Sequence, residues 1–459
     1  MPAIFAAGRA EPRPWGRALG WLLLLGVFFF ASYGYANWVA SRHSGVGTIV
    51  FEWERRIPLL AWTIVPYWLI DPLYAVSLFL CATRRALDAH ALRLLAAQVI
   101  AVACFLLFPL HFSFERGAVD GAYGWMFDVL MKFDRPYNQA PALHIALLII
   151  LWGVYRRTVP RVWHWPLNLV FALIAVSVLT TWQHHFFDMA TGVWLGWFCV
   201  WLFPDDERSL LAQAVLTRDA RRWRLALRYT LAALMMAVVA VGLGGAWLWL
   251  LWVSGSLGLV ATIYAAFNEA AFQKHSDGFI SSASQWLLGP YFLGAWANSR
   301  WWTRAMAPAD AVVLGVLLGR IPTRTECERL GVAAIVDVCA ELPCPARSAR
   351  YLHVPMLDLV TPRVDQIERA SSAIEAAHTG GAVLVCCALG LSRSALAVAA
   401  WLMRNRVVAS PEEAVALVRA ARPAVVLGPA HLAALQDWKH WHAANGAAPG
   451  PGAGSRPNR

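Results

Sequence analysis

The chain is 459 residues long, 59% of its residues are hydrophobic and 15% are charged, and its mean hydropathy is +0.50. Soluble globular proteins are about half apolar and about one-quarter charged, so this composition excludes an ordinary soluble protein and indicates an integral membrane protein. The net charge is +11, but the arginines cluster at the ends of apolar segments and no nucleic-acid-binding motif is present. We therefore expect membrane lipids, and no nucleic acid, as partners. The eight cysteines lack the spacing of a zinc site or a disulfide framework, so we expect no metal and no cofactor.

Apolar segments that suggest membrane spans fill the first 267 residues. Some are shorter than the roughly 20 residues that a span needs, so we expect their helices to extend beyond these bounds. Trp and Tyr stand near many of the ends, as in an aromatic belt, and no small-residue cleavage site follows the first segment, which we therefore take as a retained helix. The eight expected spans are residues 21–38, 62–82, 94–112, 142–155, 166–181, 187–203, 225–241 and 247–267.

Arginines fix the expected orientation of these spans. Because cytoplasmic connections are enriched in Lys and Arg, the N-terminus and the connections after the second, fourth and sixth spans are predicted to be cytoplasmic. Eight spans then return the chain to the cytoplasm near Phe267, in what the Ala-, Arg-, Gly- and Pro-rich composition suggests is a bacterial inner membrane. Only residues 242–245 separate the last two spans; one helix over both would far exceed the bilayer, so we expect two. If they formed one span, the C-terminal domain would lie outside. The arginines concerned are Arg9, Arg13, Arg17, Arg84, Arg85, Arg93, Arg156, Arg157, Arg161, Arg218, Arg221, Arg222 and Arg224.

The C-terminal part of the chain contains a pattern typical of phosphate chemistry. Val383–Cys387 is an apolar run that predicts a buried strand, and the alanine-rich segment after the following loop predicts a helix. Cys387 and Arg393 stand six positions apart across this loop, which contains Gly390 and Ser392. Backbone N–H groups of such a loop converge on an oxyanion and stabilise a thiolate, and a guanidinium binds two phosphate oxygens. We therefore predict Cys387 as a nucleophile and Arg393, Gly390 and Ser392 as phosphate-binding residues.

Two more residues fit this chemistry. Asp358, upstream, can protonate the leaving oxygen, and Ser394 can support the thiolate when it departs. Over about residues 310–438 the chain resembles the cysteine-dependent dual-specificity phosphatase family, which implies a soluble α/β domain. That family usually has histidine before the nucleophile, whereas this chain has Cys386, a vicinal thiol with which Cys387 could oxidise. The loop carries no Lys or Arg beyond Arg393, which favours a monophosphate substrate, either a lipid or phosphotyrosine.

A second polar group lies in connections that the arginine distribution predicts to be periplasmic. Lys132, Arg135 and His144 belong to the segment that leads into the fourth span, and His184 and Asp188 join the fifth span to the sixth. Ionisable groups at the ends of spans indicate a functional site by default. His184 and Asp188 are four residues apart, so on one helical turn the carboxylate can orient the imidazole. Lys132 and Arg135 can neutralise a phosphoryl group, and His144 can protonate a leaving oxygen.

These residues, with Pro136 and Pro141, resemble the three-part signature of the type 2 phosphatidic acid phosphatase superfamily, closest to the branch shared with inositol phosphorylceramide synthases, over residues 58–205. The resemblance implies a phosphohistidine at His184, formed as His144 protonates the leaving group, without a metal. Ala142 stands where that signature usually has serine, and the usual serine-arginine pair before the third motif is absent. The loss of that arginine fits the synthase-like branch.

The sequence thus predicts a polytopic α-helical membrane domain of about eight transmembrane helices followed by a soluble α/β dual-specificity-phosphatase-like domain. The expected function is a bifunctional membrane phosphatase that hydrolyses phosphate monoesters, with lipids as expected substrates. Two alternatives stay open: a phosphoalcohol head-group transferase coupled to a lipid phosphate phosphatase, and a membrane-tethered phosphatase acting on phosphoproteins. The expected parts are residues 1–57 with the first span, 58–205, 206–267 with two further spans, an interfacial tether at 268–309, the phosphatase domain at 310–445, and a disordered tail at 446–459.

Overall fold

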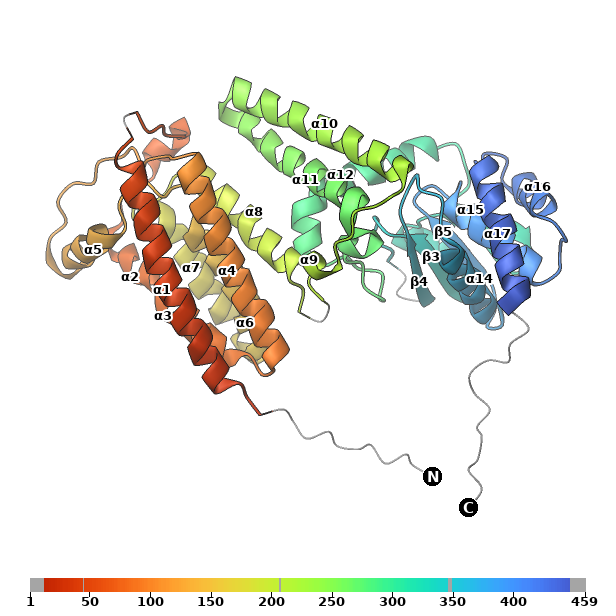
Figure 1. The fold of residues 1–459 in the computed structure, drawn as a ribbon, viewed down its shortest axis with the longest axis horizontal. Coiled ribbons are helices and arrows are strands. Elements are labelled where there is room, and N and C mark those ends of the chain that lie inside the picture. Colours follow the sequence, from red (N-terminus) through yellow and green to blue (C-terminus); the bar gives the residue numbers. More distant parts are fainter. Residues whose placement is uncertain (1–11, 44, 206–207, 346–348, 446–459) are drawn as a thin grey trace, which may run out of the picture. The chain divides into compact units, whose positions relative to one another are not determined.

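The computed structural model describes residues 12–43, 45–205, 208–345 and 349–445. The chain forms two compact units, residues 1–214 and 215–459, which are described separately below (Figure 1). The predicted tail at 446–459 and the predicted cytoplasmic Arg9 lie outside the described residues.

The first unit is a bundle of helices. By length and composition, six helical segments of the described residues could cross a membrane, four of them in this unit: Trp15–Ala40, Ala61–Leu80, Arg84–Leu107 and Arg161–Thr180. The segments expected at 142–155 and 187–203 are helical but only 16 and 17 residues long, short of the roughly 20 that a span needs. The helices are α1 (Trp15–Ala40), α2 (Ile64–Trp68), α3 (Ile70–Leu80), α4 (Arg84–Leu107), α5 (Gly121–Phe133), α6 (Leu143–Thr158), α7 (His164–Thr180), α8 (Phe186–Leu202) and α9 (Leu210–Gln213), with 3-10 turns η1 (Glu52–Arg56), η2 (Ala61–Thr63) and η3 (Arg161–Trp163).

Two glycines let α6 and α8 approach closely. A Cβ at Gly192 would lie 2.5 Å from the carbonyl oxygen of Ala142, and one at Gly196 would lie 2.8 Å from that of Ala146. Small residues spaced by four allow this backbone contact in helix pairs. The Ala142 N–H also donates to the carbonyl oxygen of Asp188 at 2.9 Å. The contact therefore sets the start of α6 beside the start of α8.

The second unit begins with three helices. They are α10 (Ala220–Leu243), α11 (Leu250–Thr262) and α12 (Ser282–Trp302), with η4 (Gly245–Trp249), a π-helical turn η5 (Ile263–Phe267) and η6 (Glu269–Phe272) between them. The predicted break between the last two apolar helices is confirmed, because Gly244 and Gly245 adopt φ of +63° and +52°, a backbone conformation that ends a helix and suits glycine. The segments 220–243 and 245–267 are each long and apolar enough to cross a membrane. On α12, part of the predicted tether, Trp286, Trp296, Trp301 and Trp302 are exposed.

A five-stranded sheet follows α12 in the chain. The strands are β1 (Ala309–Val313), β2 (Val316–Arg320), β3 (Ala334–Cys339), β4 (Arg350–Met356) and β5 (Val383–Cys387), in the order β1-β2-β5-β3-β4. All neighbours are parallel except the hairpin of β1 with β2. Parallel strands need both faces covered, and β3 and β5 are buried at every position. The helices of this part are α13 (Arg324–Leu330), α14 (Val364–His378), α15 (Arg393–Arg404), α16 (Pro411–Ala421) and α17 (Pro429–Asn445).

The strand order brings three loops to one edge of the sheet. Strands β4, β3 and β5 are parallel neighbours, so the segments after their C-terminal ends lie together. Those segments carry Asp358, Glu341 and the loop from Cys387 to Arg393 respectively. The fold thus gathers the predicted phosphate loop and the predicted acid from distant parts of the sequence.

The close contact of α6 with α8 gives a stability prediction. Gly196→Leu should lower the free energy of unfolding by about 1–3 kcal/mol, because the side chain would force two packed backbones apart. Thermal unfolding of the purified full chain in detergent measures this change. Gly153→Leu on α6 is the control, since nothing lies within 4 Å of its Cβ position. Equal unfolding temperatures for the two variants would contradict the packing argument.

Candidate active site

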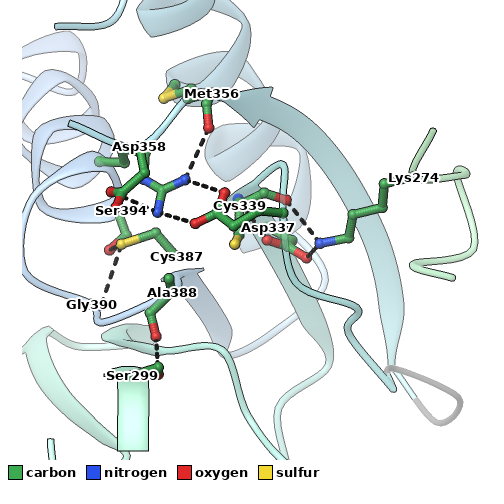
Figure 2. A network of polar contacts seen from close by, with 12 residues as sticks. Lys274, Ser299, Asp337, Cys339, Met356, Asp358, Cys387, Ala388, Gly390 and Ser394 are labelled. Atoms are coloured by element: carbon green, nitrogen blue, oxygen red, sulfur yellow. Dashed lines mark hydrogen bonds and ion pairs between the residues drawn. The ribbon is translucent and has the colours of Figure 1, made fainter. Parts of the chain in front are cut away.

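The loop after β5 forms a cradle around the thiol of Cys387. Cys387 is buried, and its Sγ accepts hydrogen bonds from the Gly390 N–H at 3.3 Å and from Ser394 Oγ at 3.2 Å (Figure 2). Gly390 has φ +75°, and a Cβ there would lie 2.3 Å from the backbone of Gly319. Only glycine fits this turn without a clash. Both donors stabilise a thiolate at Cys387.

Arg393 is buried at the first position of α15 and is held by several acceptors. Its Nη1 and Nη2 donate to the two carboxylate oxygens of Glu341 at 2.8 and 2.6 Å, and Nη1 also donates to the carbonyl oxygen of Met356 at 2.9 Å. Its Nε is buried without a hydrogen-bond partner in the described residues. A buried N–H normally has a partner, so an unpaired one beside the thiol indicates a place for an anionic oxygen.

Asp358 lies 3.0 Å from Nη2 of Arg393. Burial raises the pKa of this carboxyl, and the negative charge of Glu341 raises it further, against the opposing effect of Arg393. A raised pKa keeps a carboxylic acid protonated nearer to neutral pH, as a general acid requires. The backbone oxygen of Asp358 accepts a hydrogen bond from the Tyr264 hydroxyl at 3.1 Å. The predicted acid is therefore fixed from two sides.

Glu341 is a site residue that the sequence analysis missed. It is 2% exposed and stands two residues after β3. Burial raises the pKa of its carboxyl, but the charge and hydrogen bonds of Arg393 lower it more, and the net direction is downward. The only local signal was an acidic residue directly after a buried strand, and its partner Arg393 is 52 residues away.

Two residues near Cys387 behave differently from expectation. Ser392 Oγ lies 3.2 Å from Nε2 of His431 on α17, so this side chain already has a partner within the domain. Cys386 packs with a different set of core residues from Cys387, because successive side chains of a strand point to opposite faces. Its thiol therefore lies on the other side of the sheet from the cradle, and burial raises its pKa.

A buried ion pair lies on the Cys386 side of the sheet. Lys274, which precedes α12, donates to Asp337 Oδ2 at 2.5 Å and to the carbonyl oxygen of Cys339 at 2.9 Å (Figure 2). Asp337, Cys344 and Cys386 are the group of possible metal ligands found among the described residues, with ligand atoms within 4.8 Å of one another. Since Lys274 already neutralises this carboxylate, the arrangement is that of an internal ion pair.

The predicted histidine site lies within the first unit. His184 and Asp188 are buried, and His184 Nδ1 lies 3.7 Å from Asp188 Oδ2. They do not share a helical turn as expected, because α8 begins at Phe186. A hydrogen bond of Asp188 explains why the helix begins there. Its Oδ2 accepts from the His185 N–H at 2.8 Å and so caps the N-terminus of α8. His184 Nδ1 has no hydrogen-bond partner in the described residues.

The second predicted histidine lies close to the first. His144, at the start of α6, stacks on the ring of Tyr67 at 4.1 Å, and its Nε2 lies 3.0 Å from the Tyr67 carbonyl oxygen. The packing of α6 against α8 therefore places His144, His184 and Asp188 in one buried region.

The predicted cations of this site are not gathered there. Lys132 and Arg135 are exposed, and no hydrogen bond or ion pair within the described residues connects either one to His184. Arg116 is a nearer candidate: it donates to the backbone oxygens of Thr181 and Trp182 at 2.9 and 3.2 Å, and its Nε is buried and unpaired in the described part of the chain. An arginine in a connection predicted to be periplasmic departs from the positive-inside pattern, but Arg42, Arg55, Arg56 and Arg135 do so too, so the sequence carried no specific signal for Arg116.

A carboxylate that the sequence analysis did not select completes this region. Asp134 accepts a hydrogen bond from the Tyr33 hydroxyl at 2.7 Å and interacts with the charges of His184 and Arg116. Burial raises the pKa of Asp134, while these partners lower it. A half-buried carboxylate and a half-buried guanidinium thus accompany the two histidines.

The comparisons with known proteins concern the C-terminal domain. Residues 318–440 match the family described as dual specificity phosphatase, catalytic domain. Human dual specificity phosphatase 28 is 38% identical over 116 residues, which cover 24% of this chain and 64% of that protein. The match thus spans slightly under two thirds of the relative.

Similar solved structures cover slightly under one third of this chain. The crystal structure of human DUSP28 is 31% identical and covers 30% of this chain and 95% of its own, with a TM-score of 0.27. The structure of PTPMT1 in complex with PI(5)P is 23% identical and covers 31% of this chain and 100% of its own, with a TM-score of 0.28. From the family match and the geometry of Cys387, Arg393 and Asp358, the C-terminal part of this chain is a dual-specificity phosphatase catalytic domain.

Proposed function

We propose that the protein hydrolyses phosphate monoesters with Cys387 as its nucleophile. The observation that carries this proposal is the cradle itself: a buried thiol that accepts two hydrogen bonds, beside a buried arginine whose Nε has no partner in the described residues. An anionic tetrahedral group is the ligand that such donors fit. The match of residues 318–440 to the catalytic domain supports the same reaction.

The reaction has two steps. In the first, the Cys387 thiolate forms a bond to phosphorus while the ester P–O bond breaks, and Asp358 gives its proton to the leaving oxygen. In the second, Asp358 takes a proton from a water that attacks the phosphocysteine, inorganic phosphate leaves, and the thiolate is restored with support from Ser394. Arg393 and the loop N–H groups stabilise the charge on the phosphoryl oxygens throughout.

We also propose that the protein is integral to a membrane, with Cys387 on the cytoplasmic side of a bacterial inner membrane. Six segments of sufficient length and apolarity support the first statement. The arginines at predicted cytoplasmic ends support the orientation, and a cytoplasmic position keeps thiols reduced.

A second candidate activity belongs to the first unit. The group formed by buried His184 and Asp188 with the half-buried His144, Asp134 and Arg116 favours phosphoryl transfer through His184, with lipid phosphates as substrates. In that reaction His184 forms a bond to phosphorus while the ester P–O bond breaks, His144 gives a proton to the leaving oxygen, and the phosphoryl group then passes from His184 to an acceptor. Water or a lipid hydroxyl as the acceptor distinguishes a phosphatase from a head-group transferase. The protein would then be bifunctional.

Cys387→Ser should abolish turnover at the C-terminal site, because a serine hydroxyl is a far poorer nucleophile at neutral pH. The measurement is release of p-nitrophenol from p-nitrophenyl phosphate by the purified full chain. Binding of a phosphate mimic such as tungstate should persist, since the loop and Arg393 remain. Undiminished turnover by this variant would sink the proposed nucleophile.

Glu341→Gln should move the basic limb of the pH–rate profile to lower pH. The direction of the change follows from Asp358. The protonated form of Asp358 is the active one, so the rate falls as the pH rises through the pKa of Asp358. Glu341 raises this pKa by its negative charge, and it also pairs with Arg393, which would otherwise lower the pKa further. Removing the charge of Glu341 lowers the pKa of Asp358. The profile of kcat/KM on phenyl phosphate, which has a poor leaving group, reports this limb, and Asp358→Asn should lack it. A basic limb that stays at the same pH or moves to higher pH in Glu341→Gln contradicts the assignment of Asp358 as the general acid.

The two candidate sites should act independently. His184→Ala should remove the vanadate-sensitive, magnesium-independent hydrolysis of phosphatidic acid that persists in Cys387→Ser and should spare the Cys387-dependent activity, and Cys387→Ser should do the reverse. The losses should add, because the two sites share no residue and lie in separate units. If either single substitution silenced both activities on every substrate, the bifunctional proposal would fail.

A further inference from the structure

Three tyrosines from the helices before the sheet surround one side of the Cys387 site. They are Tyr229 on α10, Tyr264 in the π-helical turn and Tyr291 on α12. The ring of Tyr264 stacks on Tyr229 with centroids 5.6 Å apart, and Tyr291 meets Tyr229 edge-on at 5.9 Å. One member of the cluster, Tyr264, contacts the backbone of the catalytic Asp358. The cluster is therefore tied to the loop that carries the acid.

The same helices contact the loops that would hold the phosphate. The Tyr264 hydroxyl donates to the Asp358 carbonyl oxygen at 3.1 Å, and Ser299 Oγ on α12 donates to the Ala388 carbonyl oxygen at 2.5 Å (Figure 2). Arg221 at the start of α10 donates to Thr361 Oγ1 at 2.9 Å, beside the acid. Three loop contacts thus put the helices at the edge of the sheet where the substrate binds.

This position constrains the part of the substrate beyond the phosphate. The leaving oxygen must face Asp358 to receive its proton, so the group attached to that oxygen lies on the same side as Asp358. That is the side on which Tyr264 meets the acid. The organic part of the substrate consequently leaves the cradle along α10 and α12.

The outer surface of these helices is apolar over a span's length. Residues 220–243 and 245–267 can each cross a membrane by length and composition. Leu227, Leu231, Leu234, Val238 and Val241 are exposed along α10. Such a surface suits acyl chains and the hydrocarbon of a bilayer. A phosphopeptide would instead need polar partners for its backbone along this path.

The tyrosine hydroxyls have hydrogen-bonding capacity to spare. Tyr229 and Tyr291 share one side-chain hydrogen bond, which uses a single O–H of the two. One hydroxyl hydrogen and several lone pairs stay available. Both residues are only partly buried, so each leaves part of its surface open to a ligand.

We propose that the Cys387 site acts on a lipid phosphomonoester, with Tyr229 and Tyr291 binding the polar ester groups next to its phosphate while its acyl chains lie along α10. Tyr264 is a positioning residue that holds the Asp358 loop. This inference rests on the proposed phosphatase function and adds the substrate class and the residues that select it.

The experiment uses the full chain with His184→Ala, so that only Cys387-dependent turnover of lipid is counted. Three substrates are compared: dioleoyl phosphatidic acid in mixed micelles, a tyrosine-phosphorylated peptide and p-nitrophenyl phosphate. Tyr229→Phe and Tyr291→Phe keep the ring and remove the hydroxyl. Tyr351→Phe is the matched control, because its hydroxyl bonds to Asp337 at 2.8 Å and not to a catalytic loop.

Phosphatidic acid should be the better substrate than the peptide by kcat/KM. Each of Tyr229→Phe and Tyr291→Phe should lower kcat/KM on phosphatidic acid about tenfold, as for loss of one hydrogen bond, and should change p-nitrophenyl phosphate less than twofold. Tyr351→Phe should leave the ratio of kcat/KM on phosphatidic acid to kcat/KM on p-nitrophenyl phosphate unchanged. Tyr264→Phe should lower kcat more on phenyl phosphate than on p-nitrophenyl phosphate, because poor leaving groups depend on the acid.

Two results would overturn the inference while the phosphatase function stood: a higher kcat/KM on the peptide, or equal losses on lipid and p-nitrophenyl phosphate, which mark a structural role. Absence of any Cys387-dependent turnover of p-nitrophenyl phosphate would instead remove the proposed function, and the inference with it.

Discussion

The buried ion pair between Arg393 and Glu341 holds the catalytic domain's phosphate site together. Arg393 begins α15, Glu341 follows β3, and the same guanidinium reaches Met356 and Asp358 after β4. One side chain thus ties three loops that the parallel strands bring to one edge. Removing a single partner of a buried pair leaves an uncompensated charge, at a cost of about 3–5 kcal/mol. The site is therefore formed before a ligand arrives, and within the described residues the Nε of Arg393 is the part of the guanidinium left without a partner.

The residues that match the phosphatase family do not make the whole site. Tyr264 and Ser299 lie outside the matched range 318–440, yet they bond to the Asp358 and Ala388 backbones. The contacts are to carbonyl oxygens, which any residue presents, so they depend on the path of the helices and not on the motif. The turn after α11 and the helix α12 are in this way part of the scaffold of the catalytic centre.

The local sequence was sufficient to predict the residues of the Cys387 loop, but not the residue that holds Arg393 in place. Cys387, Gly390, Arg393 and Ser394 lie within eight residues, and turn geometry alone places them around one thiol. Glu341 was missed because its role depends on pairing 52 residues away.

The same distinction holds in the helical unit. His184 and Asp188 were selected by spacing, but the start of α8 at Phe186 decides how they meet. Arg116 is placed by packing of a connection that has no periodic pattern. Hydropathy located the apolar helices but not all of their ends, since α4 runs from Arg84 to Leu107 where a span at 94–112 was expected. The break at Gly244 followed from the backbone freedom of glycine.

Lys274 shows that the part of the chain that matches the phosphatase family is smaller than the part that folds with it. It lies 44 residues before the matched range begins, and it neutralises Asp337 in the middle of the sheet. A copy of residues 318–440 transplanted into another chain would carry that aspartate without its counter-ion. A recombination event that transferred the catalytic domain would therefore also have to transfer the segment before α12. We expect the tether and the domain to be inherited together.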